Sequence, residues 1–274
     1  MLKVEGYSLA PAKIRMLPPT KDQSCAPVGT CFFYNRENIT YLITNGHNLT
    51  GRNPETKDHL PGFIYQPTWL SVNLSTISSE KEGGLYKKNY LVPLYKEIDT
   101  LNEPMWLIHP EKEYSIDVVA IPFNVPEGVK IFAINEFPQS HKAIEQPGDD
   151  VFILGYPILL DETLDLPIWK RGSVATEPGQ NLGGMPKFLV DTATRPGMSG
   201  SPVILHRKTF DIDKETESIT LIQEKFIGIY SGRIGGNDEF QAQLGIVWKS
   251  SVIEEIIDGN YKSSTDFMQW KSKK

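Results

Sequence analysis

Residues 191–202 read Asp-Thr-Ala-Thr-Arg-Pro-Gly-Met-Ser-Gly-Ser-Pro, and this stretch of mostly small residues lies between two apolar runs. The flanking runs, 188–190 and 203–205, predict short buried β-strands, so the loop between them would hold Ser199 at an exposed bend. A serine hydroxyl becomes a useful nucleophile only where a neighbouring base accepts its proton and hydrogen-bond donors await the oxyanion. Glycine at positions 197 and 200 permits the backbone twist that aims the amides of Gly197 and Ser199 at one point. A simple tight turn explains the same residues equally well, because Gly, Pro and Ser all favour turns.

A candidate base lies in the first fifth of the chain. Two β-rich runs, 27–34 and 39–44, are separated by Asn-Arg-Glu-Asn and predict a hairpin. The second run ends in Asn-Gly-His-Asn, which places His47 just past a strand on a glycine-bearing turn. A single histidine is more often structural than catalytic, so His47 becomes a strong candidate only in combination with other residues.

A candidate orienting carboxylate lies between these two sites. Asp117 directly precedes the apolar run 118–121, at the mouth of a predicted buried strand. Burying a carboxylate costs free energy unless it is hydrogen bonded. Asp117 is therefore either a cap at the start of the strand or the group that fixes a histidine tautomer and stabilises the imidazolium. Its context favours the second interpretation.

The candidates occur in the order His47, Asp117, Ser199, which is one of the known orders of a Ser-His-Asp triad. With this order the chain resembles the trypsin-like (chymotrypsin-fold) serine proteases, and most closely their intracellular bacterial and viral branch. The resemblance covers about residues 25 to 258 and rests on four segments: 29–33 with 42–47, 117–121, 196–202 and 227–232. Gly46 and Asn48 depart from it, since family members usually carry small apolar residues beside the histidine.

The pattern of short strands punctuated by turns predicts an all-β chain with two barrels or sandwiches. The resemblance implies two six-stranded antiparallel β-barrels with a C-terminal α-helix. A capping-box pattern at Ser251 and Glu254, an apolar stripe and Gly259 predict that helix. The expected boundaries are an N-terminal arm (1–22), a first barrel with His47 and Asp117 (23–135), a second barrel with Ser199 (136–249), and a helix and loosely packed tail (250–274).

The resemblance also implies a function, that of a serine endopeptidase working through an acyl-enzyme. Ser199 would attack the scissile carbonyl, His47 would transfer the proton and Asp117 would orient His47. The amides of Gly197 and Ser199 would form the oxyanion hole. Ser231 would hydrogen bond the triad carboxylate, and residues 229–233 would pair with an extended substrate. Ala193 would lie at the base of the primary specificity pocket, and the expected substrate-binding residues are Ala193, Thr194, Tyr230, Ser231, Gly232 and Arg233. The alternatives are a catalytically silent peptide-binding or scaffold module and an esterase-type acyl hydrolase.

Composition and charge limit the partners, the cofactors and the cellular location that we expect. The chain has 274 residues and a net charge of −6, with no basic run beyond a short lysine-rich tail, which argues against nucleic acid as a partner. It shows no secretory signal and no run long enough to span a bilayer, so we predict a cytoplasmic protein with no membrane partner. In that compartment Cys25 and Cys31 are expected as reduced thiols. The five histidines lack metal-site spacing, so neither a metal nor any other cofactor is expected. The expected partner is a protein or peptide substrate. The sequence leaves open whether a separately encoded activator is also needed.

Overall fold

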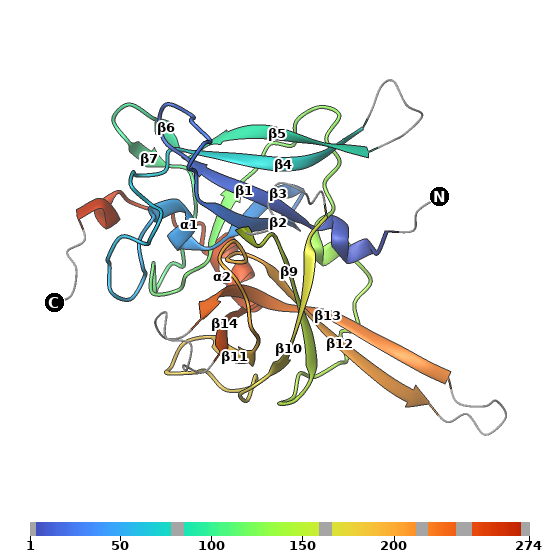
Figure 1. Ribbon diagram of the computed structural model, residues 1–274. Helices are drawn as coiled ribbons and strands as arrows, with labels where there is room; N and C mark the ends of the chain where they lie inside the picture. The colour runs from blue at the N-terminus through green and yellow to red at the C-terminus, as the bar shows by residue number, and fades with distance from the viewer. Residues whose placement is uncertain (1–3, 78–84, 159–165, 212–218, 234–242, 270–274) are drawn as a thin grey trace.

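Two antiparallel β units make up the chain (Figure 1). The computed structural model describes residues 4–77, 85–158, 166–211, 219–233 and 243–269. The first unit is a six-stranded sheet with strand order β5-β4-β1-β2-β3-β8. Its strands are β1 (Pro11–Leu17), β2 (Val28–Arg36), β3 (Ile39–Thr44), β4 (Trp69–Ile77), β5 (Leu85–Pro93) and β8 (Val119–Pro122). The ribbon of β6 (Tyr95–Glu97) and β7 (Asn102–Pro104) stands apart from this sheet.

The second unit is a closed six-stranded barrel with strand order β10-β11-β14-β13-β12-β9. Its strands are β9 (Asp150–Gly155), β10 (Ile168–Val174), β11 (Lys187–Asp191), β12 (Pro202–Asp211), β13 (Ile219–Arg233) and β14 (Leu244–Lys249). The arms of β12 and β13 extend beyond the barrel as a long hairpin (Figure 1). The prediction of an all-β chain is confirmed, and the second half is a barrel rather than a sandwich.

The first unit has six antiparallel strands, as predicted. Its edge strands β5 and β8 are not joined by a ladder in the part of the chain that the structure describes. The free side of β8 instead makes a single bridge from Ala120 to Leu107. Among the described residues, the first unit is a six-stranded antiparallel sheet that packs around its own core.

Strand β2 is buried on both faces, so its side chains pack against both units. Successive side chains of a strand point to opposite faces. Cys31 and Phe33 pack in the core of the first sheet, whereas Phe32 and Tyr34 pack in a second cluster that includes residues of the barrel. The rings of Phe32 and Phe226 meet edge to face with their centroids 5.3 Å apart. Apolar packing of this kind holds the two units together at their junction.

The C-terminal helix α2 (Ser251–Gly259) is confirmed, but its predicted capping box does not form. The residue before the helix is Ser250, which makes no side-chain cap, and Glu254 instead accepts a hydrogen bond from Tyr34 Oη at 2.7 Å. The apolar face of α2 is buried in the cluster at the junction through Val252, Ile253, Ile256 and Ile257. In the described parts of the chain, no helix combines the length and apolar composition needed to cross a membrane.

Both ends of the chain are more ordered than the sequence predicted. The expected N-terminal arm contains the short 3-10 helix η1 (Gly6–Leu9) and β1, which pairs with β2 and β4 inside the first sheet. The expected loose tail contains the 3-10 helix η4 (Asp266–Gln269), whose Phe267 is fully buried in the core of the first sheet. Burial of apolar side chains holds both segments on the sheet: several from β1, including Ile14 and Met16, and Phe267 from η4.

Candidate active site

His47 and Asp117 meet at the edge of the first sheet. His47 lies in the short helix α1 (Gly46–Thr50), which follows β3, and Asp117 lies in the turn before β8, the neighbour of β3. His47 Nδ1 lies 2.6 Å from Asp117 Oδ2, and the backbone amide of His47 donates to Asp117 Oδ1 at 2.9 Å. Asp117 is almost fully buried and the His47 side chain is 10% exposed. A carboxylate at Nδ1 favours the tautomer with the proton on that nitrogen, which leaves the lone pair of Nε2 available as a base.

Ser231 links this pair to the barrel. Its hydroxyl, at the end of β13, donates to Asp117 Oδ2 at 2.5 Å. The carbonyl of the same residue accepts a hydrogen bond of 3.4 Å from Ser199 Oγ. Asp117 thus accepts three hydrogen bonds, which compensate its desolvation. Ser199 lies in the loop between β11 and β12, so the three predicted residues come together at the junction of the two units, with the Ser199 hydroxyl turned toward Ser231 in this structure.

The loop before Ser199 is a type II turn over residues 195–198. Met198 N donates to Arg195 O at 3.3 Å, and Gly197 has a φ of +96°. Proline at the second position and glycine with positive φ at the third are what this turn type requires. The carbonyl of Pro196 accepts a hydrogen bond of 3.0 Å from Ile158 N. Since C=O and N–H point in opposite directions across a trans peptide, this bond directs the Gly197 N–H away from Ile158.

Thr30 of β2 anchors the same loop from the first sheet. Its amide donates to Ser199 O at 2.9 Å, and its hydroxyl donates to Gly197 O at 2.9 Å. The hydroxyl also accepts a 3.2 Å hydrogen bond from Tyr156 N, and Thr30 is fully buried. Sequence reasoning missed Thr30, although a hydroxyl inside an otherwise apolar strand was a signal available to it.

Asn48, which departs from the family pattern, has a structural role beside the histidine. Its side-chain amide donates to Thr44 Oγ1 at 3.0 Å and to Ser199 O at 3.4 Å. Gly29 makes room for it, since a Cβ there would lie 3.0 Å from Asn48 Nδ2. The other departure, Gly46, faces Asp117 Oδ1, 3.3 Å from where its Cβ would be. Both departures therefore fit the geometry of the His47 turn.

The buried side chain of Tyr114 packs against the turn that carries His47. The side chain of Tyr114 lies 3.5 Å from the Cβ position of Gly46. Its hydroxyl accepts a hydrogen bond of 3.0 Å from Trp106 Nε1 and is also paired with Ser263 of the C-terminal segment. Burial raises the pKa of Tyr114 above its usual range, so this residue stays neutral at physiological pH. The C-terminal segment thus contributes to the support of the candidate site.

The predicted substrate-binding residues occupy different environments. Ala193 is exposed, whereas Thr194 is buried and its hydroxyl is hydrogen bonded to the hydroxyl of Tyr230. Tyr230 is only 1% exposed, so its side chain lies in the interior rather than on the surface. Gly232 has a φ of +133° beside a register shift in β13, and the last residue of the strand, Arg233, pairs with Gly245 of β14.

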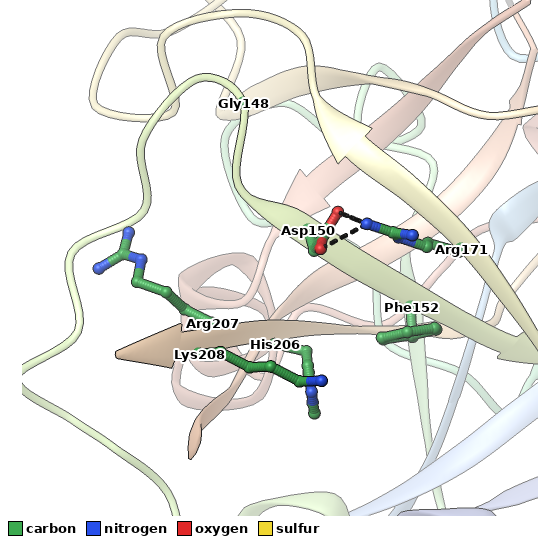
Figure 2. A pocket seen from close by; sticks show the side chains of 7 residues that line it. All are labelled: Gly148, Asp150, Phe152, Arg171, His206, Arg207 and Lys208. Atoms are coloured by element: carbon green, nitrogen blue, oxygen red, sulfur yellow. Dashed lines mark hydrogen bonds and ion pairs between the residues drawn. The ribbon is translucent and has the colours of Figure 1, made fainter. Parts of the chain in front are cut away.

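A surface groove of about 540 Å³ lies elsewhere on the barrel (Figure 2). Its walls come from β9, β10 and β12, and none of the predicted site residues lines it. Two of its cationic groups are neutralised by neighbouring carboxylates: Arg171 Nη2 lies 2.8 Å from Asp150 Oδ2, and Arg207 Nε donates to Asp149 Oδ1 at 2.9 Å. These pairings make the groove a poor receptor for an anion.

The two cysteines are separate thiols. Cys25 is exposed and Cys31 is buried, and both are free. Burial raises the pKa of the Cys31 thiol far above its usual range, which makes it a weak nucleophile. Cys31 therefore acts as an apolar core residue.

The Thr30 hydroxyl is expected to position the loop. We expect Thr30→Val to slow the reaction of Ser199 with a fluorophosphonate about tenfold, because the Gly197 carbonyl and the Tyr156 amide lose a buried partner. Thr30→Ser keeps the hydroxyl and should restore the rate. The measurement is the labelling rate at a temperature well below the melting point of each variant. Equal rates for Thr30→Val and wild type would show that the backbone bond to Ser199 alone positions the loop.

Two antiparallel β units with a histidine and an aspartate from one and a serine from the other are the arrangement of the chymotrypsin-fold serine proteases. The family model described as "Trypsin-like peptidase domain" matches residues 29–209, a range that contains His47, Asp117 and Ser199. This match covers more than half of the chain, so the chain belongs to the trypsin-like peptidase family, whose members are serine proteases.

The solved structures that match this chain include two proteases. The Rv3671c protease in its inactive form is 15% identical, with 92% of this chain and 89% of that chain covered and a TM-score of 0.45. The HtrA-type protease AlgW, determined with a tripeptide, is 14% identical, with 92% of this chain and 60% of that chain covered and a TM-score of 0.47. No curated protein sequence matches the chain significantly.

Proposed function

We propose that this chain is a serine endopeptidase in which Ser199 is the nucleophile, His47 the general base and Asp117 the residue that orients His47. One observation carries the proposal. The buried Asp117 carboxylate accepts hydrogen bonds from His47 Nδ1, His47 N and Ser231 Oγ. These bonds fix the orientation of the imidazole. They also hold the histidine of one β unit beside Ser231, which belongs to a strand of the other unit.

In the proposed reaction Ser199 Oγ first rotates from the Ser231 carbonyl toward His47. The Oγ then bonds to the carbonyl carbon of the scissile peptide as its proton passes to His47 Nε2. The carbonyl oxygen becomes an oxyanion, which accepts hydrogen bonds from the amides of Gly197 and Ser199. The tetrahedral intermediate collapses to the acyl-enzyme, and the leaving amine takes the proton from His47. Water then attacks the acyl carbon, loses its proton to His47 and releases the acid, with the proton returned to Ser199.

The turn over residues 195–198, which carries the Gly197 amide, supports the proposal. Its central peptide is held by the bond from Ile158 to Pro196, and its Gly197 carbonyl by Thr30, so no donor has to be rebuilt during the reaction. The separately encoded activator that the sequence left open and the cytoplasmic location both stay predictions.

The end of β13 supports a peptide rather than a small ester as substrate. Residues 231–233 are the last three of β13, and the Ser231 carbonyl accepts a hydrogen bond from Ser199 Oγ. An extended peptide laid along this stretch would gain main-chain hydrogen bonds that a small ester lacks. We therefore expect turnover to rise with peptide length, whereas an esterase would be insensitive to it.

The test is active-site labelling with a fluorophosphonate. We expect covalent labelling of the wild type and its loss in Ser199→Ala and His47→Ala, because the reagent requires an activated serine. The exposed residues Ser115 and His141 provide the matched controls Ser115→Ala and His141→Ala, which should label like the wild type. Labelling that persists in Ser199→Ala would assign the nucleophile elsewhere. A folded wild type that does not label would favour the catalytically silent peptide-binding module.

A further inference from the structure

The side chain of Tyr230 lies inside the barrel and bridges three segments. The residue is 1% exposed, although its backbone belongs to the stretch of β13 next to the candidate site. Its hydroxyl is hydrogen bonded to the hydroxyl of Thr194, in the segment that leads to Ser199. Its ring lies against Gly245 of β14, where a Cβ would come within 2.4 Å of the ring carbon Cε2. The ring thus spans the space between β13, β14 and the loop before the nucleophile.

Main-chain hydrogen bonds hold the backbone of Tyr230 at this place. Its amide donates to Ser201 O at 2.9 Å, and its carbonyl accepts from Gly200 N at 2.9 Å. The next residue, Ser231, points to Asp117, beside the register shift in β13. The Tyr230 side chain points into the barrel, where it belongs to the core cluster. The ring cannot leave this space without breaking the buried bond to Thr194 and opening a cavity.

A substrate side chain directed into the barrel beside Ser199 would reach the same space. In the proposed binding geometry, a peptide with its carbonyl carbon at Ser199 Oγ and its backbone along residues 231–233 lies beside the Ser231 carbonyl, which Ser199 Oγ contacts. Tyr230 comes just before this stretch and is bonded to Thr194 and packed on Gly245, so such a side chain would meet its ring. In this structure Tyr230 already occupies that space.

We infer that the Tyr230 ring fills the specificity pocket of this chain, so that the proposed endopeptidase cleaves after small residues such as glycine, alanine and serine. This inference rests on the proposed function of Ser199. A large side chain would have to displace a buried ring that is hydrogen bonded and packed against a glycine, and overpacking of that kind is unfavourable. Gly245 and Tyr230 are complementary, because any side chain at position 245 would meet the ring.

The test uses two peptidyl diphenyl phosphonates that differ only in the side chain beside phosphorus, methyl or benzyl. Ser199 Oγ bonds to phosphorus, a phenolate leaves, and the serine proton passes through His47 to give phenol. We expect the wild type to react with the methyl compound at least about 100-fold faster than with the benzyl compound. Tyr230→Val, which empties the space, should reduce this ratio at least about tenfold. Tyr230→Phe keeps the ring and should keep the ratio within about threefold.

A small fluorophosphonate without a side chain separates the two proposals. If it labels Ser199 while the methyl and benzyl phosphonates react at equal rates with the wild type, the pocket is open and the inference about Tyr230 is wrong, although the proposed nucleophile stands. If it does not label Ser199, the proposed function fails and this inference fails with it. The ratio of the methyl to the benzyl reaction rate in the wild type tests the inference about Tyr230 even if Tyr230→Val does not fold.

Discussion

Asp117→Asn is expected to lower kcat/KM for peptide hydrolysis about 10,000-fold while leaving the fold intact. The carboxylate accepts hydrogen bonds from His47 Nδ1, His47 N and Ser231 Oγ. A carboxamide of the same shape has only one acceptor oxygen, so its NH2 group must face one of these donors. Facing His47 Nδ1, it would favour the tautomer with the proton on Nε2, which cannot accept a proton from Ser199.

The measurement is kcat/KM on a peptide substrate together with the melting temperature. Asp150→Asn is the matched control, because Asp150 lies at the surface and pairs with Arg171 away from the site (Figure 2). Its activity should stay within about twofold of the wild type, since exposed ion pairs contribute little. If Asp117→Asn stays folded and loses less than about tenfold in activity, Asp117 does not orient the base.

Gly197→Ala is expected to reduce fluorophosphonate labelling and kcat/KM at least about 100-fold. Gly197 has a φ of +96°, and a Cβ there would lie 2.3 Å from Tyr156 O and 3.0 Å from Ile158 N. Both contacts are with backbone atoms, so no side chain can move aside. The turn over residues 195–198 would have to change type, which would turn the amide of residue 197 away from the oxyanion.

The control for this change is Gly179→Ala. A Cβ at Gly179 would meet nothing within 4 Å, so we expect labelling and melting temperature like those of the wild type. The labelling rates and melting curves of both variants give the comparison. A Gly197→Ala variant that labels at the wild-type rate would show that the Gly197 amide does not stabilise the oxyanion.

The hairpin 28–44 and the strands that flank Asp117 and the Ser199 loop were predictable from the sequence because their signals are local. Apolar runs and turn residues are readable over a few positions, and β2, β3, β8, β11 and β12 lie where these patterns predicted strands. The order of strands within a sheet is not local. It depends on segments far apart in the chain, so the order β5-β4-β1-β2-β3-β8 was not predictable from the sequence.

The residues that hold the Ser199 loop, Thr30 and Asn48, could not be predicted from the sequence either. Thr30 is more than 160 positions from Gly197 and Ser199, and no periodicity connects a strand hydroxyl to a loop carbonyl at that separation. The same holds for Asn48, whose sequence context suggested only a departure from the family pattern. Its contact with the Ser199 carbonyl exists because the two β units pack against each other.

By itself, the sequence determined the all-β class, the C-terminal helix and the order of His47, Asp117 and Ser199, because strand periodicity, the apolar stripe of a helix and loops of small residues are properties of neighbouring positions. Only the tertiary structure decided that Phe267 docks on the first sheet and that Thr30 and Asn48 hold the loop that carries Ser199. It also decided that the Tyr230 ring points inward to Thr194. The physical reason is that each of these features is a contact between segments far apart in the chain, and burial and hydrogen bonding select such contacts only when the whole fold has formed.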